Sequence, residues 1–248
     1  MALEALIFDV DGTLAETEET HRRALNDTFA AFDLPWEWDR ATYRRLLRVM
    51  GGKERLLHYI EFEGPDGAER AFERLDEMHA AKNARYAELV REGSVTLRPG
   101  VERLIREARA ENLKVAIATT TSRRNVEALL AATIGADWPD LFQAIAAGDE
   151  APAKKPAPDV YQLAIERLST TPSSAVAFED TSHGLRSAVA AGLACVVTPS
   201  EYSDDQNFSG AAAVFNQLGE PGRPARHIAG AGAGATLVTV AFLRGLVA

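Results

Sequence analysis

Short apolar runs alternate with longer amphipathic stretches along most of this chain. The apolar runs cover residues 5–10, 114–119, 144–147, 175–178 and 194–198. A short apolar run bounded by turn signals is typical of a strand buried on both faces. Strands that alternate with helices predict crossover connections, so we expect an α/β fold with a doubly wound, mainly parallel, Rossmann-like sheet. Ligands of such sheets bind beyond the carboxyl ends of the strands.

The stretch 16–94 has a different pattern. It is rich in Arg, Glu, Ala and Leu at helical spacing and holds no strand-like run. Pro35 and the turn residues 64–67 divide it into several helices. We therefore predict an all-helical cap domain inserted into the α/β core. The predicted limits are 16–94 for the cap, 1–15 plus 95–248 for the core, and 15–17 and 94–99 for the hinges.

Composition narrows the possible partners. With 248 residues, 46% of them hydrophobic, the chain can bury a sizeable core. Its net charge of −9 argues against nucleic acid or an anionic membrane as the main partner, but not against a small phosphorylated substrate. The single cysteine, Cys195, lies in an apolar run and is expected to be buried in a reducing compartment. Without a signal-peptide pattern or a membrane-spanning run, we expect a cytoplasmic protein, monomeric by default.

Two carboxylates, Asp9 and Asp11, follow the first apolar run. Side chains at i and i+2 of an extended segment point the same way, so both can face one pocket. Mg²⁺ is often held by one or two carboxylates plus phosphate oxygens, and a carboxylate can attack a metal-neutralised phosphoryl group while a neighbouring acid transfers the proton. Gly12 permits a tight turn beside the ligand. Taken alone, the pattern also fits a solvated turn or part of a calcium loop.

Three further strand ends carry polar groups. The hydroxyl cluster 119–122 suits phosphate binding, although a helix cap would also explain it. Lys155 precedes a proline, which restricts its backbone, and a fixed ammonium there can neutralise phosphate; the alternative is a surface turn. The acid pair Glu179 and Asp180 can complete a metal site, and an acidic surface loop is its alternative.

The order of these four motifs is more informative than any one of them, because all follow predicted parallel strands and so converge on one sheet edge. Over residues 5–198 the constellation resembles the haloacid dehalogenase superfamily of phosphatases. The resemblance implies that Asp9 is a nucleophile, that Asp11 is a general acid and base, and that Thr119 and Lys155 hold the phosphoryl group. It also implies a Mg²⁺ site formed by Asp9, Asp11, Asp180 and the Val10 carbonyl, with Glu179 in an outer position.

The location of the cap between the first two motifs is similar to the helical-cap subgroup, which includes β-phosphoglucomutase and phosphoglycolate phosphatase. Within it, residues 15–23, 51–55 and 118–122 resemble those of CbbY-type proteins of the Calvin cycle. Proteins of that type dephosphorylate xylulose-1,5-bisphosphate, and the resemblance implies that substrate here.

A bisphosphate needs a second anion site away from the metal. Gly51, Gly52, Lys53 and Arg55 offer backbone N–H groups, an ammonium and a guanidinium for it. A solvated helix face is the alternative for such basic residues. The other predicted substrate contacts are Glu16 and Tyr43 to sugar hydroxyls, Thr120 in the hydroxyl cluster, and His21, which would couple cap closure to the site.

The last part of the chain matches no motif after about Asn216, and the low-complexity segment 229–235 predicts a flexible or irregular connection. Three other functions stay open at this point. They are a β-phosphoglucomutase-like phosphotransferase, a phosphoglycolate phosphatase, and a non-catalytic binding protein on the same fold.

Overall fold

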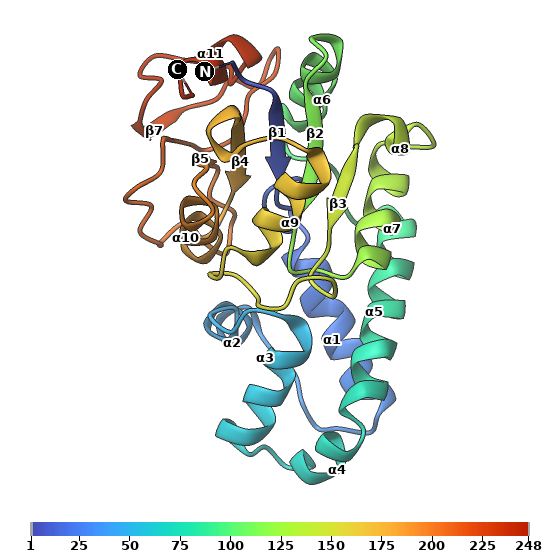
Figure 1. Ribbon diagram of the computed structural model, residues 1–248. Coiled ribbons are helices and arrows are strands. Elements are labelled where there is room, and N and C mark those ends of the chain that lie inside the picture. The colour runs from blue at the N-terminus through green and yellow to red at the C-terminus, as the bar shows by residue number, and fades with distance from the viewer. Residues whose placement is uncertain (1, 248) are drawn as a thin grey trace.

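A computed structural model describes residues 2–247 and shows an α/β core with a helical region below it (Figure 1). Across these residues one sheet of seven strands has the order β3-β2-β1-β4-β5-β6-β7. Its strands are β1 Ala5–Phe8, β2 Lys114–Ala118, β3 Ala144–Ala146, β4 Ala175–Glu179, β5 Ala194–Val197, β6 Ala213–Phe215 and β7 His227–Gly230. Neighbouring strands pair in parallel, except β6 with β7. The predicted α/β class with a mainly parallel sheet is confirmed.

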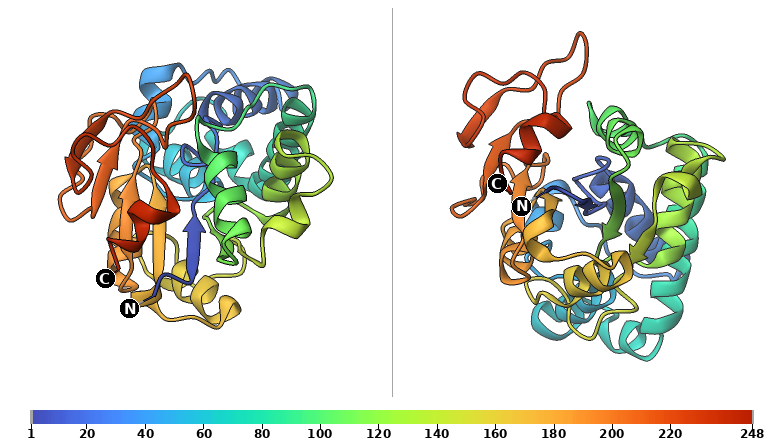
Figure 2. Two further views of the ribbon diagram at one scale, coloured as in Figure 1. Left: turned by 90° about the horizontal axis from the view of Figure 1, so that it is seen from above. Right: turned by 45° about the horizontal axis from the view of Figure 1, so that its top comes forward.

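Helices cover both faces of this sheet (Figure 2). The core helices are α6 Val101–Ala110, α7 Arg123–Thr133, α8 Trp138–Leu141, α9 Asp159–Leu168, α10 Ser182–Ala190 and α11 Val240–Arg244, with a 3-10 turn at Pro172–Ser174. The period of two along β1 separates the faces: Leu6 and Phe8 pack with α6 and α7, whereas Ala5 and Ile7 pack with α9 and α10. Both faces of the central strands are therefore apolar.

The helical region has an apolar cluster of its own, although Ala24, Leu89 and Val90 pack into the main core. Its elements are α1 Glu18–Ala31, α2 Arg40–Leu46, α3 Gly52–His58, a π-helical turn Tyr59–Glu63, α4 Ala68–Glu73 and α5 Leu75–Arg91. They enclose an apolar cluster of their own, in which the ring of Phe29 packs edge-on against Trp36 and Trp38. The predicted breaks at Pro35 and at 64–67 fall between helices. The domain limits stay a prediction, and the predicted ends at residues 1 and 248 lie outside the described residues.

The C-terminal segment is more ordered than its sequence predicts. Ala229 and Gly230 belong to β7, an antiparallel edge strand beside β6, so the expectation of an irregular 229–235 connection is wrong for these two residues. The later residues Val238, Val240 and Leu243 are buried in the main core. Among residues 2–247, no helix combines the length and apolar character needed to cross a bilayer.

Arg98 fastens the junction between the helical region and the core. Its guanidinium pairs with Glu16 at 3.1 Å, and the residue is only 9% exposed. It also donates to the backbone carbonyls of Gly12, Thr198 (2.7 Å), Pro199 (2.8 Å) and Asn216 (3.0 Å). One side chain therefore satisfies buried acceptors from three separate segments of the core.

We expect Arg98→Met to lower the free energy of unfolding by about 3 kcal/mol, because several buried carbonyls lose their donor at once. For a chain of this length that corresponds to a fall in Tm of roughly 6–12 °C by calorimetry. The matched control is Arg106→Met, which removes exposed pairs with Glu102 and Asp137 and should cost at most about 1 kcal/mol. Equal losses in both variants would contradict the role of Arg98.

Candidate active site

Strands β1 and β4 bring the first and fourth motifs together at the point where the strand order changes direction. Phe8 lies opposite Phe178 in the parallel register, and their rings stack with centroids 4.3 Å apart. The next residue on each strand is an acid, Asp9 on one and Glu179 on the other. The Asp9 N–H donates to the Phe178 carbonyl at 3.0 Å, which fixes the start of the first loop. The site therefore lies where open parallel sheets bind their ligands.

Lys155 lies in the middle of the acidic groups. Its ammonium donates to Asp9 Oδ1 at 2.7 Å, to Glu179 Oε1 at 2.6 Å and to the Ala118 carbonyl at 2.9 Å. Tyr161 also donates to Glu179 Oε1, at 2.7 Å. All three hydrogens of the ammonium are used, so its position is fixed. Burial alone lowers the pKa of Lys155, but the two carboxylates outweigh it and raise that pKa, so the group is charged.

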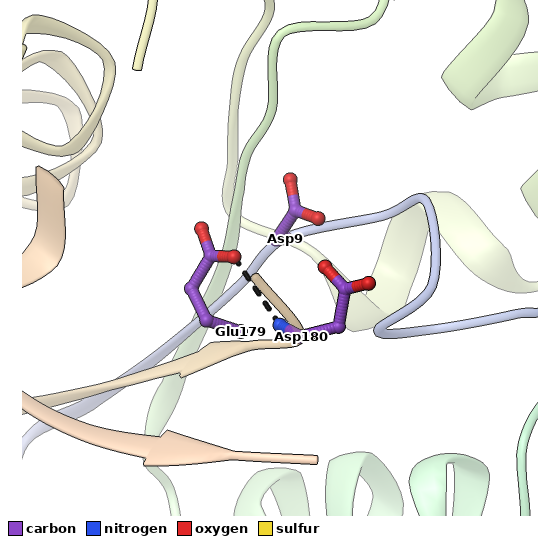
Figure 3. Close-up of side chains that lie close together, drawn as sticks. All are labelled: Asp9, Glu179 and Asp180. Carbon is purple, nitrogen blue, oxygen red and sulfur yellow. Dashed lines mark hydrogen bonds between the residues drawn. The ribbon is translucent and has the colours of Figure 1, made fainter. Parts of the chain in front are cut away.

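Asp9, Glu179 and Asp180 form a buried cluster whose carboxylate oxygens lie within 4.8 Å of one another. Figure 3 shows the three side chains at the ends of β1 and β4. Burial raises the pKa of Asp9 to about 7, partly opposed by Lys155, and burial with the charges of Asp9 and Glu179 raises the pKa of Asp180. Three ionised carboxylates and one ammonium leave two formal negative charges. A site that offers only oxygen donors and carries two net negative charges fits a hard divalent cation.

Asp11 faces a different group of residues. Its carboxylate accepts from Thr17 Oγ1 at 2.5 Å and contacts His21 Nε2 at 3.0 Å. Lys82 Nζ lies 2.8 Å from His21 Nδ1. Because an ammonium can only donate, Nδ1 accepts, and Nε2 carries the proton that is donated to Asp11. His21 and Lys82 of the helical region thus orient Asp11 of the core.

These contacts also set the charge of the acid. Burial alone raises the pKa of Asp11, but His21 and the hydrogen bonds from His21 and Thr17 hold it below its ordinary value. Burial and the charge of Lys82 lower the pKa of His21, and burial lowers the pKa of Lys82 to about 8. Asp11 is therefore ionised in the ligand-free protein.

Two predicted metal ligands have other partners in this structure, and their role in metal binding stays a prediction. The Val10 carbonyl accepts the N–H groups of Thr13 at 3.2 Å and Leu14 at 2.9 Å, so it stabilises the turn after Asp9. The Asp11 carboxylate belongs to the His21 network and is not part of the three-acid cluster. The family resemblance implies both as ligands, but it does not show how the first loop turns.

A cavity of about 700 Å³ lies between these groups and the helical region. The predicted residues that line it are Asp9, Asp11, His21, Gly51, Gly52, Arg55, Thr120, Lys155, Glu179 and Asp180. The acids and Lys155 come from the core, whereas His21 and Arg55 come from the helices opposite. The arrangement can hold an anion between a cation site and a guanidinium.

Four other predicted residues lie away from the cavity wall. Glu16 pairs with Arg98, the ammonium of Lys53 pairs with Asp76, and the Tyr43 hydroxyl donates to Glu18 at 2.6 Å. The buried Thr119 hydroxyl accepts the N–H of Thr121 at 3.2 Å. Arg55 stays at the cavity and lies over the Tyr43 ring, 5.5 Å from its centroid.

Sequence reasoning missed several residues that border the cavity. They are Glu18, Lys82, Tyr202 and Ser203. Lys82 lies one helical turn before Tyr86 on α5, and that spacing alone looks like any helix face. Tyr202 and Ser203 lie in a polar loop without a motif. No signal in the sequence separates these residues from ordinary surface positions.

Comparison with known proteins identifies the family of this chain. A family model for haloacid dehalogenase-like hydrolases matches residues 3–192, so the chain belongs to that family. The chain is 54% identical over 213 residues to protein CbbY of Rhodobacter capsulatus, covering 85% of this chain and 92% of the relative. CbbY from Rhodobacter sphaeroides, solved as a variant in complex with xylulose-1,5-bisphosphate, aligns with a TM-score of 0.81 and 45% identity over 87% of this chain and 94% of that one.

A putative β-phosphoglucomutase from Thermotoga maritima is more distant. It aligns with a TM-score of 0.63 and 28% identity over 86% of this chain and 94% of that one. The chain is therefore a haloacid dehalogenase-like hydrolase with strong similarity to CbbY proteins.

We expect Mg²⁺ to stabilise the protein more at pH 8 than at pH 5.5. Asp9, with its pKa of about 7, holds a proton at the lower pH, and this proton must leave before a metal can bind; the raised pKa of Asp180 acts in the same direction. At pH 8 and one hundred times the Kd, binding adds about 2.7 kcal/mol, or roughly 5–11 °C in Tm. Asp180→Asn should abolish the shift and the exposed Asp149→Asn should keep it. A shift that is equal at both pH values would contradict this assignment.

Proposed function

We propose that this protein is a Mg²⁺-dependent phosphatase that acts through an aspartyl-phosphate on Asp9, with xylulose-1,5-bisphosphate as its substrate. The observation that carries the proposal is the buried Asp9–Lys155–Glu179 cluster beside Asp180, at one end of a cavity with Arg55 among its lining residues. The similarity of this chain to CbbY proteins supports a sugar bisphosphate as the substrate. Bound Mg²⁺ would be held by Asp9 and Asp180, with Glu179 beside them, and would neutralise charge on the phosphoryl group.

The first chemical step uses Asp9 and Asp11. A carboxylate oxygen of Asp9 attacks phosphorus, and the bond between phosphorus and the sugar oxygen breaks. Asp11 gives a proton to that leaving oxygen, so the sugar departs as an alcohol. Because Asp11 is ionised in the ligand-free protein, it must first take up a proton as the anionic substrate binds. Lys155 keeps Asp9 in place through the 2.7 Å hydrogen bond.

The second step regenerates the enzyme. Asp11 accepts a proton from water, the water oxygen attacks phosphorus, and the bond to Asp9 breaks to release inorganic phosphate. The same side chain therefore acts as acid and then as base. His21 and Lys82, both from the helical region, support this role because they orient Asp11 from the cap side. Catalysis would then depend on the cap lying against the core.

The proposed distal phosphate site is formed by Gly51, Gly52 and Arg55, which border the cavity opposite the acids. The Arg55 guanidinium matches the geometry of phosphate oxygens. Lys53 belonged to the same sequence motif, but its ion pair with Asp76 turns it toward another surface. Within this proposal Arg55 therefore carries more of the second phosphate than Lys53.

The alternative functions differ in substrate more than in chemistry. A β-phosphoglucomutase-like phosphotransferase would form the same aspartyl-phosphate and pass it back to a sugar. A phosphoglycolate phosphatase would need no distal guanidinium, which the cavity provides. Phosphate release from p-nitrophenyl phosphate excludes a non-catalytic binding protein, and conversion of glucose phosphate isomers distinguishes a mutase. We further propose a cytoplasmic setting, supported by the single buried Cys195.

Asp9→Asn is expected to lower kcat on the order of 10³-fold or more, because an amide oxygen cannot form the aspartyl-phosphate. The change conserves shape, so the variant should fold. Its Tm and near-ultraviolet circular dichroism check the fold, and phosphate release measures the activity. Turnover close to that of the unaltered protein would remove Asp9 from its proposed role.

Arg55→Ala is expected to raise KM for xylulose-1,5-bisphosphate roughly 10–100-fold and to affect p-nitrophenyl phosphate much less. The reason is the loss of a charged hydrogen bond to the distal phosphate, about 1.5–3 kcal/mol. Lys53→Ala is the matched control, because it removes a nearby cation of the same motif that lies off the cavity. Equal losses on both substrates would show that no distal phosphate is bound by Arg55.

A further inference from the structure

Residues 199–206 form a loop between β5 and β6 that touches both the core acids and the helical region; we call it the bridging loop. Ser200, Tyr202 and Ser203 of this loop line the cavity. The proposed chemistry does not use any of them. Two adjacent side chains of the loop, Tyr202 and Ser203, make contacts in two different parts of the molecule.

Ser203 faces the core. It is 1% exposed and donates to the Asp180 carbonyl at 2.7 Å, with Asp180 Oδ2 3.4 Å away. Its oxygen in turn accepts the Ser200 N–H at 2.8 Å. A Cβ added at Gly12 would lie 2.1 Å from the same Asp180 Oδ2 and 3.0 Å from Ser200 Cβ. Asp180 is thus packed between the first loop and the bridging loop.

Tyr202 faces the helical region. The residue is 7% exposed, its ring packs edge-on against Tyr43 with centroids 5.6 Å apart, and its hydroxyl donates to Glu19. Among the described residues, it is the one member of the apolar cap cluster that comes from outside 16–94. The cap therefore closes over an aromatic side chain of the core.

An ion pair adds to this contact. Arg44 of α2 donates to Asp204 at 2.8 Å and also to the Glu201 carbonyl. Its side chain is 39% exposed and that of Asp204 66%, so solvent screens the pair strongly. Burial of the Tyr202 ring is therefore the main attraction between the bridging loop and the cap.

We propose that Tyr202 is a positioning residue that links cap closure to Mg²⁺ binding; the proposal rests on the proposed magnesium-dependent function. The ring, held in the cap, fixes the backbone of the bridging loop. That backbone keeps Ser203 against Asp180 and so holds the carboxylate in the orientation that a metal needs. When the cap moves away, the ring is exposed to water and the loop loses this support.

This link works in both directions. If a closed cap increases the affinity for Mg²⁺, then bound Mg²⁺ must favour the closed cap by the same factor. The metal would therefore do more than neutralise phosphate, because it would also help to assemble the cavity before the sugar arrives. His21 and Lys82 would reach Asp11 in the same closure.

The test is a calorimetric titration of the full-length protein with Mg²⁺ at pH 8 in the absence of substrate. Tyr202→Ala should raise the Kd for Mg²⁺ about tenfold, the lower end of the usual effect of groups that orient metal ligands. Tyr202→Phe keeps the ring and should bind like the unaltered protein. Ser203→Ala, at the other end of the link, should weaken binding about as much as Tyr202→Ala.

Tyr59→Ala is the matched control, because Tyr59 packs in the same cap cluster against Trp36 and Trp38 rather than against the bridging loop. It should lower the Tm and leave the Kd for Mg²⁺ unchanged. If Tyr202→Ala does not fold, the Ser203→Ala titration decides the question.

The outcomes separate this inference from the proposed function. An unaltered protein that binds no Mg²⁺ would contradict the function itself. Mg²⁺ binding of normal strength in a folded Tyr202→Ala or Ser203→Ala variant would overturn the positioning role while leaving the function intact. A weaker Kd in Tyr59→Ala, equal to that of Tyr202→Ala, would also overturn it, because any loosening of the cap would then suffice.

Discussion

The buried ammonium of Lys155 between Asp9 and Glu179 is the interaction on which the rest of the site depends. Neighbouring carboxylates in a dry interior repel one another and resist ionisation, as the raised pKa values of Asp9 and Asp180 show. Lys155 compensates part of the negative charge of these carboxylates. A divalent cation can neutralise the negative charge that is left. The fold supports this arrangement because two adjacent parallel strands, β1 and β4, end at the same level.

The core and the helical region contribute different groups to the site. The core supplies the acids and Lys155, which are held by strand ends and by hydrogen bonds to backbone groups. The helical region supplies groups that act at a distance from the nucleophile. His21 and Lys82 orient Asp11, while Arg55 borders the far side of the cavity. A site divided in this way is complete only when both layers meet.

The junction between the layers is built from polar and aromatic contacts of different strength. Arg98 is buried and bonds several carbonyls of the core, so its side chain is held in one position. Tyr202 packs against Tyr43 a few residues further along the bridging loop, and the Arg44–Asp204 ion pair beside it is partly exposed. The junction therefore combines a buried polar network with a weaker contact that is partly exposed to solvent.

The sequence by itself determined five strands, their mainly parallel arrangement and the helical character of 16–94, because apolar periodicity and turn residues act locally; it did not determine β6 and β7. It also determined that Asp9, Lys155, Glu179 and Asp180 would meet, since each follows a parallel strand. Only the tertiary structure decided where side chains point. The turn after Asp9 engages the Val10 carbonyl, and Lys53 pairs away from the cavity. Lys82 and Tyr202 reach the cavity because segments distant in the sequence pack together. A local sequence pattern does not predict such packing.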